Sequence, residues 1–352
     1  MKIGLLTFND TNNFGSYLQT FGLYKAVEDL GYDCEIIDYQ CQAIKAREQY
    51  GTYNASLNPK EILKDILFNR VLRKKYRNLQ SWLSSNAKIG VSYERHNIKD
   101  SYNAYDKFLV GSDIVWGMDI IDKDTTYFLD FFRGKDKKIA FASSIGNPWC
   151  VEDKKILAPL LNDFSRIAVR EEESADWVKE LTLMRPQVVC DPTMLLSSET
   201  WAKYKSEKYA SEKYVLVYFQ TKQNLIDAKR IAKEKGLKCY VINYGLPVKG
   251  FKSVSPTNMA DFLSLFYYAS FVCTGSYHGM LFSIYFNREF AYFNRAHKSR
   301  MNTLAEKLGV QDREGTEYDV LNMKPIDYIT VNSKVSTYRE FSINCLKDML
   351  KA

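Results

Sequence analysis

Short apolar runs along the chain alternate with segments in which apolar residues recur every three or four positions. The first round is a strand pattern at 2–8, an amphipathic helix at 16–31 that ends on Gly31, and a second strand at 34–39. Further strand patterns follow at 107–112, 138–144, 166–170 and 188–193. Strands that alternate with helices predict an α/β domain with a mainly parallel sheet.

A second round of the same alternation occupies the rest of the chain. Its strand and helix patterns lie at 214–220, 224–236, 239–245, 259–270, 271–279 and 289–294. We therefore expect two Rossmann-like, doubly wound domains: residues 1–200, with a helical insertion at about 57–86, and residues 201–330. The last apolar pattern predicts a C-terminal helix within 331–352 that packs back on the first domain.

The composition is that of a globular protein and not of a disordered or fibrous chain, since 46% of the 352 residues are hydrophobic and 26% are charged. No apolar run approaches the ~20 residues of a membrane-spanning helix, and the first residues lack the apolar core of a signal peptide. We therefore expect a soluble, cytoplasmic protein. The seven cysteines are scattered without metal-ligand spacing, which predicts reduced thiols, no disulfides and no structural zinc.

The charge balance suits several kinds of partner. Lys and Arg exceed Asp and Glu by seven, which fits an anionic small substrate or a membrane surface as well as nucleic acid. The densest basic segment, 68–83, has apolar residues at helical spacing, so we interpret its charges as a solvated helix face. Contact of this face with anionic lipid head groups, as a peripheral membrane contact, is the alternative. We expect no nucleic-acid partner.

Three polar segments follow strand patterns, at the edge where open parallel sheets bind their ligands. The first, 8–16, contains Asn12 and Asn13 but a single glycine, so it is not a dinucleotide-binding fingerprint. The asparagine amides could hydrogen-bond a sugar or an anion. They could equally serve as turn and helix-cap residues.

The second polar segment places Arg170 at the end of a strand pattern, before three glutamates that fill the first turn of the next helix. A guanidinium aimed at the ligand edge would bind a carboxylate or a phosphate through two parallel hydrogen bonds. The alternative is a surface ion pair with one of these glutamates.

The third polar segment is the start of a helix after the strand pattern at 271–274. Gly275, Ser276 and Gly279 flank this start, so free backbone amides and the positive end of the helix dipole would face an anion there. His278, one of three histidines, stands in the first helical turn and could exchange a proton with a ligand near neutral pH. The alternative is a histidine with a structural role only.

A set of motifs spans nearly the whole chain. In order, they are MKIGLLTFNDTNNFGSYLQTFGL, FLVGSDIVW, YFLDF, KKIAFASSIG, AVREEES, CDPT, TGSYHGMLFSIYFNREF and IDYITVN. Together they resemble the polysaccharide pyruvyl transferase family, which is similar in fold to two-domain GT-B glycosyltransferases and moves an enolpyruvyl unit from phosphoenolpyruvate to a sugar. The resemblance implies that Arg170 and His278 line the donor site, with a basic residue of 294–300 nearby. Lys298 is our first choice for that residue and Arg295 the second.

This resemblance implies a mechanism that needs no metal and no cofactor. His278 would protonate the methylene carbon of phosphoenolpyruvate, or assist the departure of phosphate, and two sugar hydroxyls would form a cyclic ketal. Asp113 of the GSD motif, with Ser112 beside it, or an asparagine of the 9–13 loop, would bind and orient the acceptor or take its proton. A helix N-cap is the alternative for Asp113.

We therefore expect a phosphoenolpyruvate-dependent pyruvyl transferase. Its acceptor would be a sugar of a surface polysaccharide, such as a capsule or an exopolysaccharide, or of a precursor linked to undecaprenyl diphosphate. Its place would be the cytoplasm, at the inner face of the membrane. Two alternatives remain open: a GT-B glycosyltransferase that uses a nucleotide sugar, and a catalytically silent sugar-binding protein of polysaccharide assembly.

Overall fold

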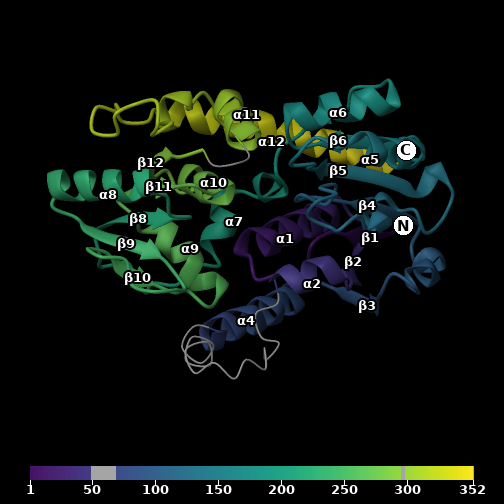
Figure 1. Ribbon diagram of the computed structural model, residues 1–352, viewed down its shortest axis with the longest axis horizontal. Coiled ribbons are helices and arrows are strands. Elements are labelled where there is room, and N and C mark those ends of the chain that lie inside the picture. Colours follow the sequence, from purple (N-terminus) through teal and green to yellow (C-terminus); the bar gives the residue numbers. More distant parts are fainter. Residues whose placement is uncertain (49–68, 295–297, 352) are drawn as a thin grey trace. The chain divides into compact units, whose positions relative to one another are not determined.

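A computed structural model of the chain describes residues 1–48, 69–294 and 298–351 (Figure 1). The chain divides into two compact units. The first consists of Met1–Gln49, Leu83–Leu196 and Ser336–Ala352, and the second of Tyr50–Trp82 and Ser197–Val335. Each unit has its own parallel sheet and its own hydrophobic core, which confirms the prediction of two Rossmann-like domains.

The first unit contains a seven-stranded sheet with the strand order β3-β2-β1-β4-β5-β6-β7, and all its pairs are parallel. The strands are β1 (Lys2–Leu6), β2 (Asp33–Tyr39), β3 (Ile89–Tyr93), β4 (Lys107–Val110), β5 (Lys138–Ser143), β6 (Arg166–Val169) and β7 (Gln187–Val188). The helices are α1 (Phe14–Asp29), α2 (Gln42–Glu48), α5 (Val151–Leu161) and α6 (Glu172–Thr182), with the short 3-10 helices η2 (Ile98–Ala104), η3 (Thr125–Phe128), η4 (Lys135–Lys137) and η5 (Pro192–Leu195). Every residue of the interior strand β5 is buried, as in parallel sheets that are covered on both faces.

The second unit contains a five-stranded parallel sheet with the order β10-β9-β8-β11-β12. The strands are β8 (Tyr214–Tyr218), β9 (Lys238–Ile242), β10 (Lys252–Val254), β11 (Phe271–Thr274) and β12 (Glu289–Tyr292). The helices are α7 (Ser198–Ala202), α8 (Lys222–Lys235), α9 (Met259–Tyr267), α10 (Tyr277–Tyr285) and α11 (Lys298–Leu308), with the 3-10 helix η6 (Gln311–Arg313).

The C-terminal helix α12 (Tyr328–Lys351) belongs to both units. At its start, the Tyr328 hydroxyl donates to the Arg288 carbonyl of the second unit. Further along, Arg339 Nε donates to the Met194 carbonyl at 2.5 Å, and Ser342 Oγ accepts from the amide of Cys190 at 2.9 Å, both in the first unit. The predicted return of this helix to the first domain is confirmed.

The helical insertion predicted at about 57–86 lies partly outside the described residues. Its described part is α4 (Arg70–Asn86), and the residues up to Trp82 group with the second unit and not with the predicted first domain. The reason is aromatic packing, since the rings of Trp82 and Tyr204 meet edge to face with centroids 5.6 Å apart.

The basic residues of α4 divide between its two faces. Arg70, Lys74 and Arg77 are exposed at helical spacing, as a solvated face requires. The Lys75 ammonium instead lies 4.6 Å from the ring centroid of Tyr244 in the second unit. Over the described ranges, no helix is both long enough and apolar enough to cross a membrane.

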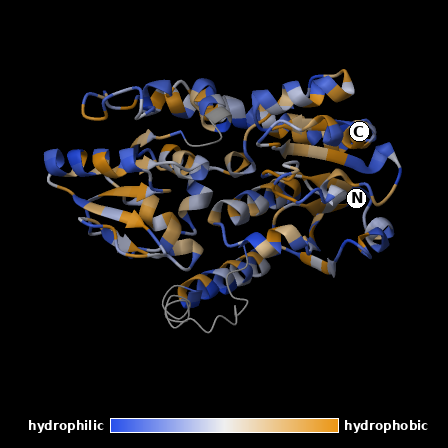
Figure 2. Ribbon diagram, viewed as in Figure 1, coloured by the Kyte–Doolittle hydropathy of each residue, from blue (hydrophilic) through white to orange (hydrophobic). Residues whose placement is uncertain are grey.

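The strand predictions need three corrections. The sequence pattern misses β3 and β10, which are edge strands, and Val91 of β3 is 68% exposed, so no apolar run marks it. The strand predicted at 188–193 ends at Val188, because Asp191 caps the 3-10 helix η5 and Pro192 starts it. Other predicted strands end earlier than expected, as at 214–220, where β8 ends at Tyr218, and at 239–245, where β9 ends at Ile242. Figure 2 shows hydrophobic residues concentrated in the strands of both sheets, while the helices carry a mixture.

The tryptophan of the FLVGSDIVW motif is a core residue. Trp116 is fully buried, its ring stacks on Phe128 with centroids 5.4 Å apart, and its Nε1 donates to the Tyr127 carbonyl at 3.0 Å. These contacts fix the loop after β4 that carries Asp113.

Candidate functional site

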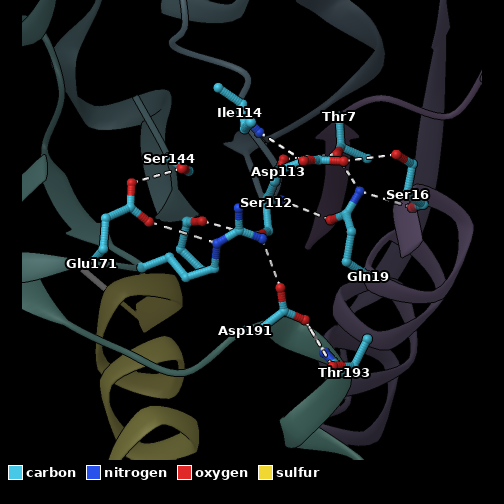
Figure 3. Close-up of polar contacts among 12 residues, drawn as sticks. Thr7, Ser16, Gln19, Ser112, Asp113, Ile114, Ser144, Glu171, Asp191 and Thr193 are labelled. Carbon is cyan, nitrogen blue, oxygen red and sulfur yellow. Dashed lines mark hydrogen bonds and ion pairs between the residues drawn. The ribbon is translucent and has the colours of Figure 1, made fainter. Parts of the chain in front are cut away.

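A network of hydrogen bonds connects α1 to the carboxyl edge of the first sheet (Figure 3). Gln19, which is fully buried, donates to Thr7 Oγ1 at 2.9 Å and accepts from the Ser112 amide at 3.1 Å. The Thr7 hydroxyl donates to the Ser112 carbonyl at 3.1 Å. Ser112, a predicted substrate-binding residue, is therefore held by β1 and α1 and is itself completely buried.

Asp113 follows in the same loop, with its backbone in the left-handed region at φ 71°. One carboxylate oxygen accepts from Ser16 Oγ at 2.7 Å, and the other accepts from the Ile114 amide at 2.9 Å. Residues 114–124 form bends and turns, so the helix N-cap alternative for Asp113 is wrong. The carboxylate is instead fixed at the sheet edge by a hydroxyl from α1.

Arg170 lies at the end of β6 and is 3% exposed. Its Nη1 is 2.8 Å from Asp191 Oδ2 and 3.5 Å from Ser112 Oγ, and its Nε is 3.7 Å from Glu171 Oε2. The alternative of a surface ion pair is therefore wrong, because the ion pairs are buried. The guanidinium contacts carboxylates of its own unit, those of Asp191 and Glu171, which are labelled in Figure 3.

Both acidic partners of Arg170 are held by further hydrogen bonds. Asp191 Oδ1 accepts from the Thr193 amide at 2.9 Å and from its hydroxyl at 2.8 Å. Glu171 Oε1 accepts from Ser144 Oγ at 2.6 Å and from Ser174 Oγ. Local sequence patterns do not predict this network of hydrogen bonds. The Asp-Pro pair of CDPT marks a helix start, but it gives no sign of an ion pair with Arg170.

The asparagines of the loop after β1 have local roles. Asn13 is the N-cap of α1, and its Oδ1 accepts from the Gly15 amide at 2.9 Å, so the cap interpretation is confirmed for this residue. Asn12 is 6% exposed and lies within the same loop. A direct contact of either residue with a sugar stays a prediction.

The candidate site of the second unit is the turn between β11 and α10. Ser276 is the N-cap of α10, with its Oγ accepting from the Gly279 amide at 3.3 Å. The Ser276 amide donates to Thr274 Oγ1 at 3.1 Å, and the Gly275 amide donates to the Tyr218 carbonyl at 3.0 Å. The expectation that these amides are free is wrong, because neighbouring residues take all of them.

Gly279 is required by close packing. A Cβ at this position would overlap with Thr274 Oγ1 and lie 3.0 Å from the ring of Tyr218. Glycine therefore lets the first turn of α10 lie directly on β11 and β8. The positive end of the α10 dipole is held at the carboxyl edge of the sheet.

His278 is the second residue of α10. Eight of the nine residues of this helix are buried, and His278 is the exception. Its ring lies edge to face with that of Tyr277, with centroids 5.6 Å apart. The imidazole is partly exposed, although its Nε2 is buried, and a histidine at a helix start can exchange a proton with a bound ligand.

Two predicted donor residues lie where the structure describes little. Arg295 lies outside the described residues, and of Lys298 only the backbone is described, as the first residue of α11. The choice between them stays a prediction. Arg170, Ser112 and Asp113 belong to the first unit, and His278, Ser276, Gly275 and Gly279 to the second.

Burial disfavours the thiolate form of Cys190 and Cys273, which adjoin site residues in the sequence. Burial raises the pKa of Cys190 to about 12 and holds the pKa of the Cys273 thiol well above its usual range. A neutral thiol is a poor nucleophile and a poor metal ligand. Within the described part of the chain, no group of three His, Cys, Asp or Glu side chains is arranged to hold a metal ion.

Comparison with solved structures identifies the fold. The S. aureus MnaA-UDP co-structure is 13% identical with a TM-score of 0.53, and the match covers 100% of this chain and 97% of that chain. UDP-N-acetylglucosamine 2-epimerase from Rickettsia bellii is 8% identical with a TM-score of 0.51, and the match covers 99% of this chain and 97% of that chain. At these identities the likeness shows the fold alone, which is the GT-B fold implied by the resemblance.

Comparison at the sequence level identifies the family. No curated protein matches the chain. The family model described as polysaccharide pyruvyl transferase matches residues 13–297, which include Asp113, Arg170 and His278. The chain therefore belongs to the polysaccharide pyruvyl transferase family.

Proposed function

We propose that the protein transfers the enolpyruvyl unit of phosphoenolpyruvate to two hydroxyls of a sugar. The acceptor is a sugar of a surface polysaccharide or of its lipid-linked precursor, and the products are a cyclic pyruvate ketal and phosphate. The observation that carries the proposal is the position of His278, the one residue of α10 that is not buried, at the positive end of that helix.

His278 acts as the general acid. It gives a proton to the methylene carbon of phosphoenolpyruvate, which leaves an oxocarbenium-like centre at C2. One sugar hydroxyl adds to C2, the C–O bond to phosphate breaks, and a second hydroxyl closes the ketal. One hydroxyl proton returns His278 to its starting state, and the other leaves with phosphate.

The donor is an anion, and two features of the second unit would bind it: the dipole of α10 and a basic side chain. The dipole of α10 supplies positive potential at the turn that contains Gly275, Ser276 and Gly279. A basic residue of the following loop, Lys298 first and Arg295 second, supplies a full charge. Donor binding by Arg170 also stays a prediction, because the described contacts give its guanidinium two carboxylate partners already.

Asp113 is proposed as the acceptor residue. Because Ser16 and the Ile114 amide each donate to one of its oxygens, its carboxylate is held in one orientation. A carboxylate so fixed can accept a hydrogen bond from a sugar hydroxyl and take its proton as the hydroxyl attacks, and this is the proton that then leaves with phosphate.

The lipid-linked form of the acceptor favours a protein that works in the cytoplasm at the inner face of the membrane. The exposed Arg70, Lys74 and Arg77 of α4 form a basic face that suits anionic head groups. This contact is part of the proposal.

The deciding experiment incubates the protein with phosphoenolpyruvate and a panel of oligosaccharides linked to undecaprenyl diphosphate or to pyrophosphate. A mass increase of one pyruvyl ketal on one panel member, with release of phosphate, is the expected result. EDTA should leave the transfer rate unchanged. Restoration of an EDTA-inhibited rate by Mg²⁺ or Mn²⁺ would contradict the metal-free mechanism.

A nucleotide-sugar transferase is the competing function. Since a ligand that binds only the folded state raises Tm, phosphoenolpyruvate should raise Tm and UDP- or GDP-sugars should not. The opposite pattern would favour the glycosyltransferase. A protein that binds a sugar but transfers nothing would be the silent binding protein.

A further inference from the structure

Phe219 is a bulky apolar residue in a conformation that such residues rarely adopt. It directly follows β8, its φ is 55°, and it is 40% exposed. A side chain of this size is disfavoured in the left-handed region. The ring packs edge to face on that of Tyr218, with centroids 4.8 Å apart, and its exposed part gives up the stabilisation that burial would provide. Both the backbone conformation and the exposure of the ring destabilise the folded state, which points to a functional role for Phe219.

The neighbouring loop holds Phe219 in this conformation. Asn224 is completely buried, and its Nδ2 donates to the Phe219 carbonyl at 3.1 Å. Its Oδ1 accepts from the Thr221 amide at 2.8 Å, and its own amide donates to Thr221 Oγ1 at 3.1 Å. The capping box of α8 therefore also fixes the turn at Phe219 that ends β8.

The strand register places Phe219 beside the turn that carries His278. Tyr218, the last residue of β8, pairs with Thr274, the last residue of β11, and accepts a hydrogen bond from the Gly275 amide at 3.0 Å. Phe219 is the next residue along, so it leaves the sheet at the same edge as Gly275. Neighbouring strands are about 4.8 Å apart, so the backbone of Phe219 lies close to the start of α10.

We propose that Phe219 binds the acceptor by packing its ring against the C–H face of a pyranose. This inference rests on the proposed function, since it assigns the ring to the sugar of that reaction. The face of an aromatic ring carries negative potential, which disfavours the carboxylate and phosphate of the donor and attracts the weakly positive C–H groups of a sugar. In this arrangement the α10 dipole binds the anionic donor, and Phe219 packs against the sugar ring of the acceptor.

The test variant is Phe219→Asn, because asparagine tolerates the left-handed region while it removes the ring. Phe219→Tyr keeps the ring. Phe341→Gln is the matched control, since Phe341 is exposed to a similar extent, 45%, on α12. Phe219→Gly is the second variant if Phe219→Asn lowers Tm, because glycine has no steric cost at this φ.

Phe219→Asn should raise the acceptor KM by about tenfold, with kcat, the KM for phosphoenolpyruvate and Tm nearly unchanged. Phe219→Tyr and Phe341→Gln should behave like the wild type. An unchanged acceptor KM would overturn the inference, and so would a rise in the KM for phosphoenolpyruvate, which would assign the ring to the donor.

Direct binding separates this inference from the proposed function. Titration calorimetry with the same panel of pyrophosphate-linked oligosaccharides measures Kd without any transfer. If the wild type binds a panel member but transfers no pyruvyl group to it, the proposed function fails, and a Kd about tenfold weaker for Phe219→Asn still supports the inference. If the wild type binds no panel member, or binds one with a Kd that Phe219→Asn leaves unchanged, the inference is overturned.

Discussion

The carboxyl edges of the two sheets carry similar polar and charged residues, but those residues differ in what surrounds them. In the first unit, Arg170 is 3% exposed and its charge faces Asp191 and Glu171. In the second unit, His278 is the one residue of α10 that is not buried, and Phe219 is 40% exposed. A buried group with complementary partners acts on the fold first, whereas a group held at the surface is available to a ligand.

The backbone shows the same difference. Both edges contain a residue in the left-handed region, Asp113 at φ 71° in the first unit and Phe219 at φ 55° in the second. Aspartate tolerates this region and its carboxylate is hydrogen-bonded on both oxygens. Phenylalanine does not tolerate it well and leaves its ring exposed. The first edge therefore holds a carboxylate fixed by hydrogen bonds, and the second edge presents a partly exposed aromatic ring.

The largest expected effect is on the second edge. His278→Gln should lower turnover by roughly 10²–10⁴-fold, because it removes the proton donor, while Tm stays nearly unchanged. The phosphoenolpyruvate-dependent rise in Tm should also remain, since glutamine leaves the helix start intact. Turnover and Tm are measured on one preparation.

His96→Gln is the control for this substitution, because the side chain of His96 is 75% exposed in the first unit. His96→Gln should change neither turnover nor Tm. A His278→Gln protein with a lower Tm and near-normal turnover would make His278 a structural residue and remove the difference between the two edges.

The second largest effect is on the first edge. Asp191→Asn removes the negative charge opposite Arg170 but keeps an oxygen for Thr193, so it leaves a buried guanidinium without its closest counter-charge. We expect a loss of about 3–5 kcal/mol in the free energy of unfolding, measured by urea denaturation.

Asp176→Asn is the matched control, because the Asp176–Arg185 pair is exposed, with 62% and 38% of the two side chains accessible. An exposed pair contributes about 0–1 kcal/mol. If Asp191→Asn and Asp176→Asn lost equal amounts of unfolding free energy, the stability of the first unit would not depend on the buried Arg170–Asp191 pair.

The sequence predicts the architecture well because burial leaves a local signature. The run at 138–144 is apolar enough to identify β5, every residue of which is buried. The cap at Asn13 and the helix start at Ser276 follow from residue type and spacing. Strand β3 has no such signature, since its side chains are largely exposed at the sheet edge.

The partners of the site residues could not be predicted, because they come from distant parts of the chain. Asp191 is 21 positions from Arg170 and Ser112 is 58 positions away. Local spacing also cannot show that Thr274 and Ser276 take the amides that an anion would need. Phe219 continues the apolar run of β8, so the sequence places it inside a strand, and only its φ reveals the turn.

The third effect concerns Arg170 itself. Arg170→Lys keeps the charge, but an ammonium cannot contact Asp191 and Glu171 in the geometry of a guanidinium. We expect a loss of about 1.5–3 kcal/mol in the free energy of unfolding, from the weakened charge-assisted hydrogen bonds. If Arg170 also binds the donor, as the resemblance implies, the KM for phosphoenolpyruvate rises as well. Lower stability with an unchanged KM and kcat would assign Arg170 to the ion-pair network alone.

The smallest expected change in stability separates the cap of α10 from its anion site. Ser276→Ala removes the cap and should cost about 1 kcal/mol of unfolding free energy. Ser276→Asp restores a cap, so its stability should equal or exceed that of the wild type, but it places a negative charge where the donor anion is proposed to bind. The KM for phosphoenolpyruvate should then rise by at least about tenfold, through repulsion between like charges at short range. A Ser276→Asp protein with normal stability and a normal KM would show that the donor binds elsewhere, and the second edge would lose its proposed role in anion binding.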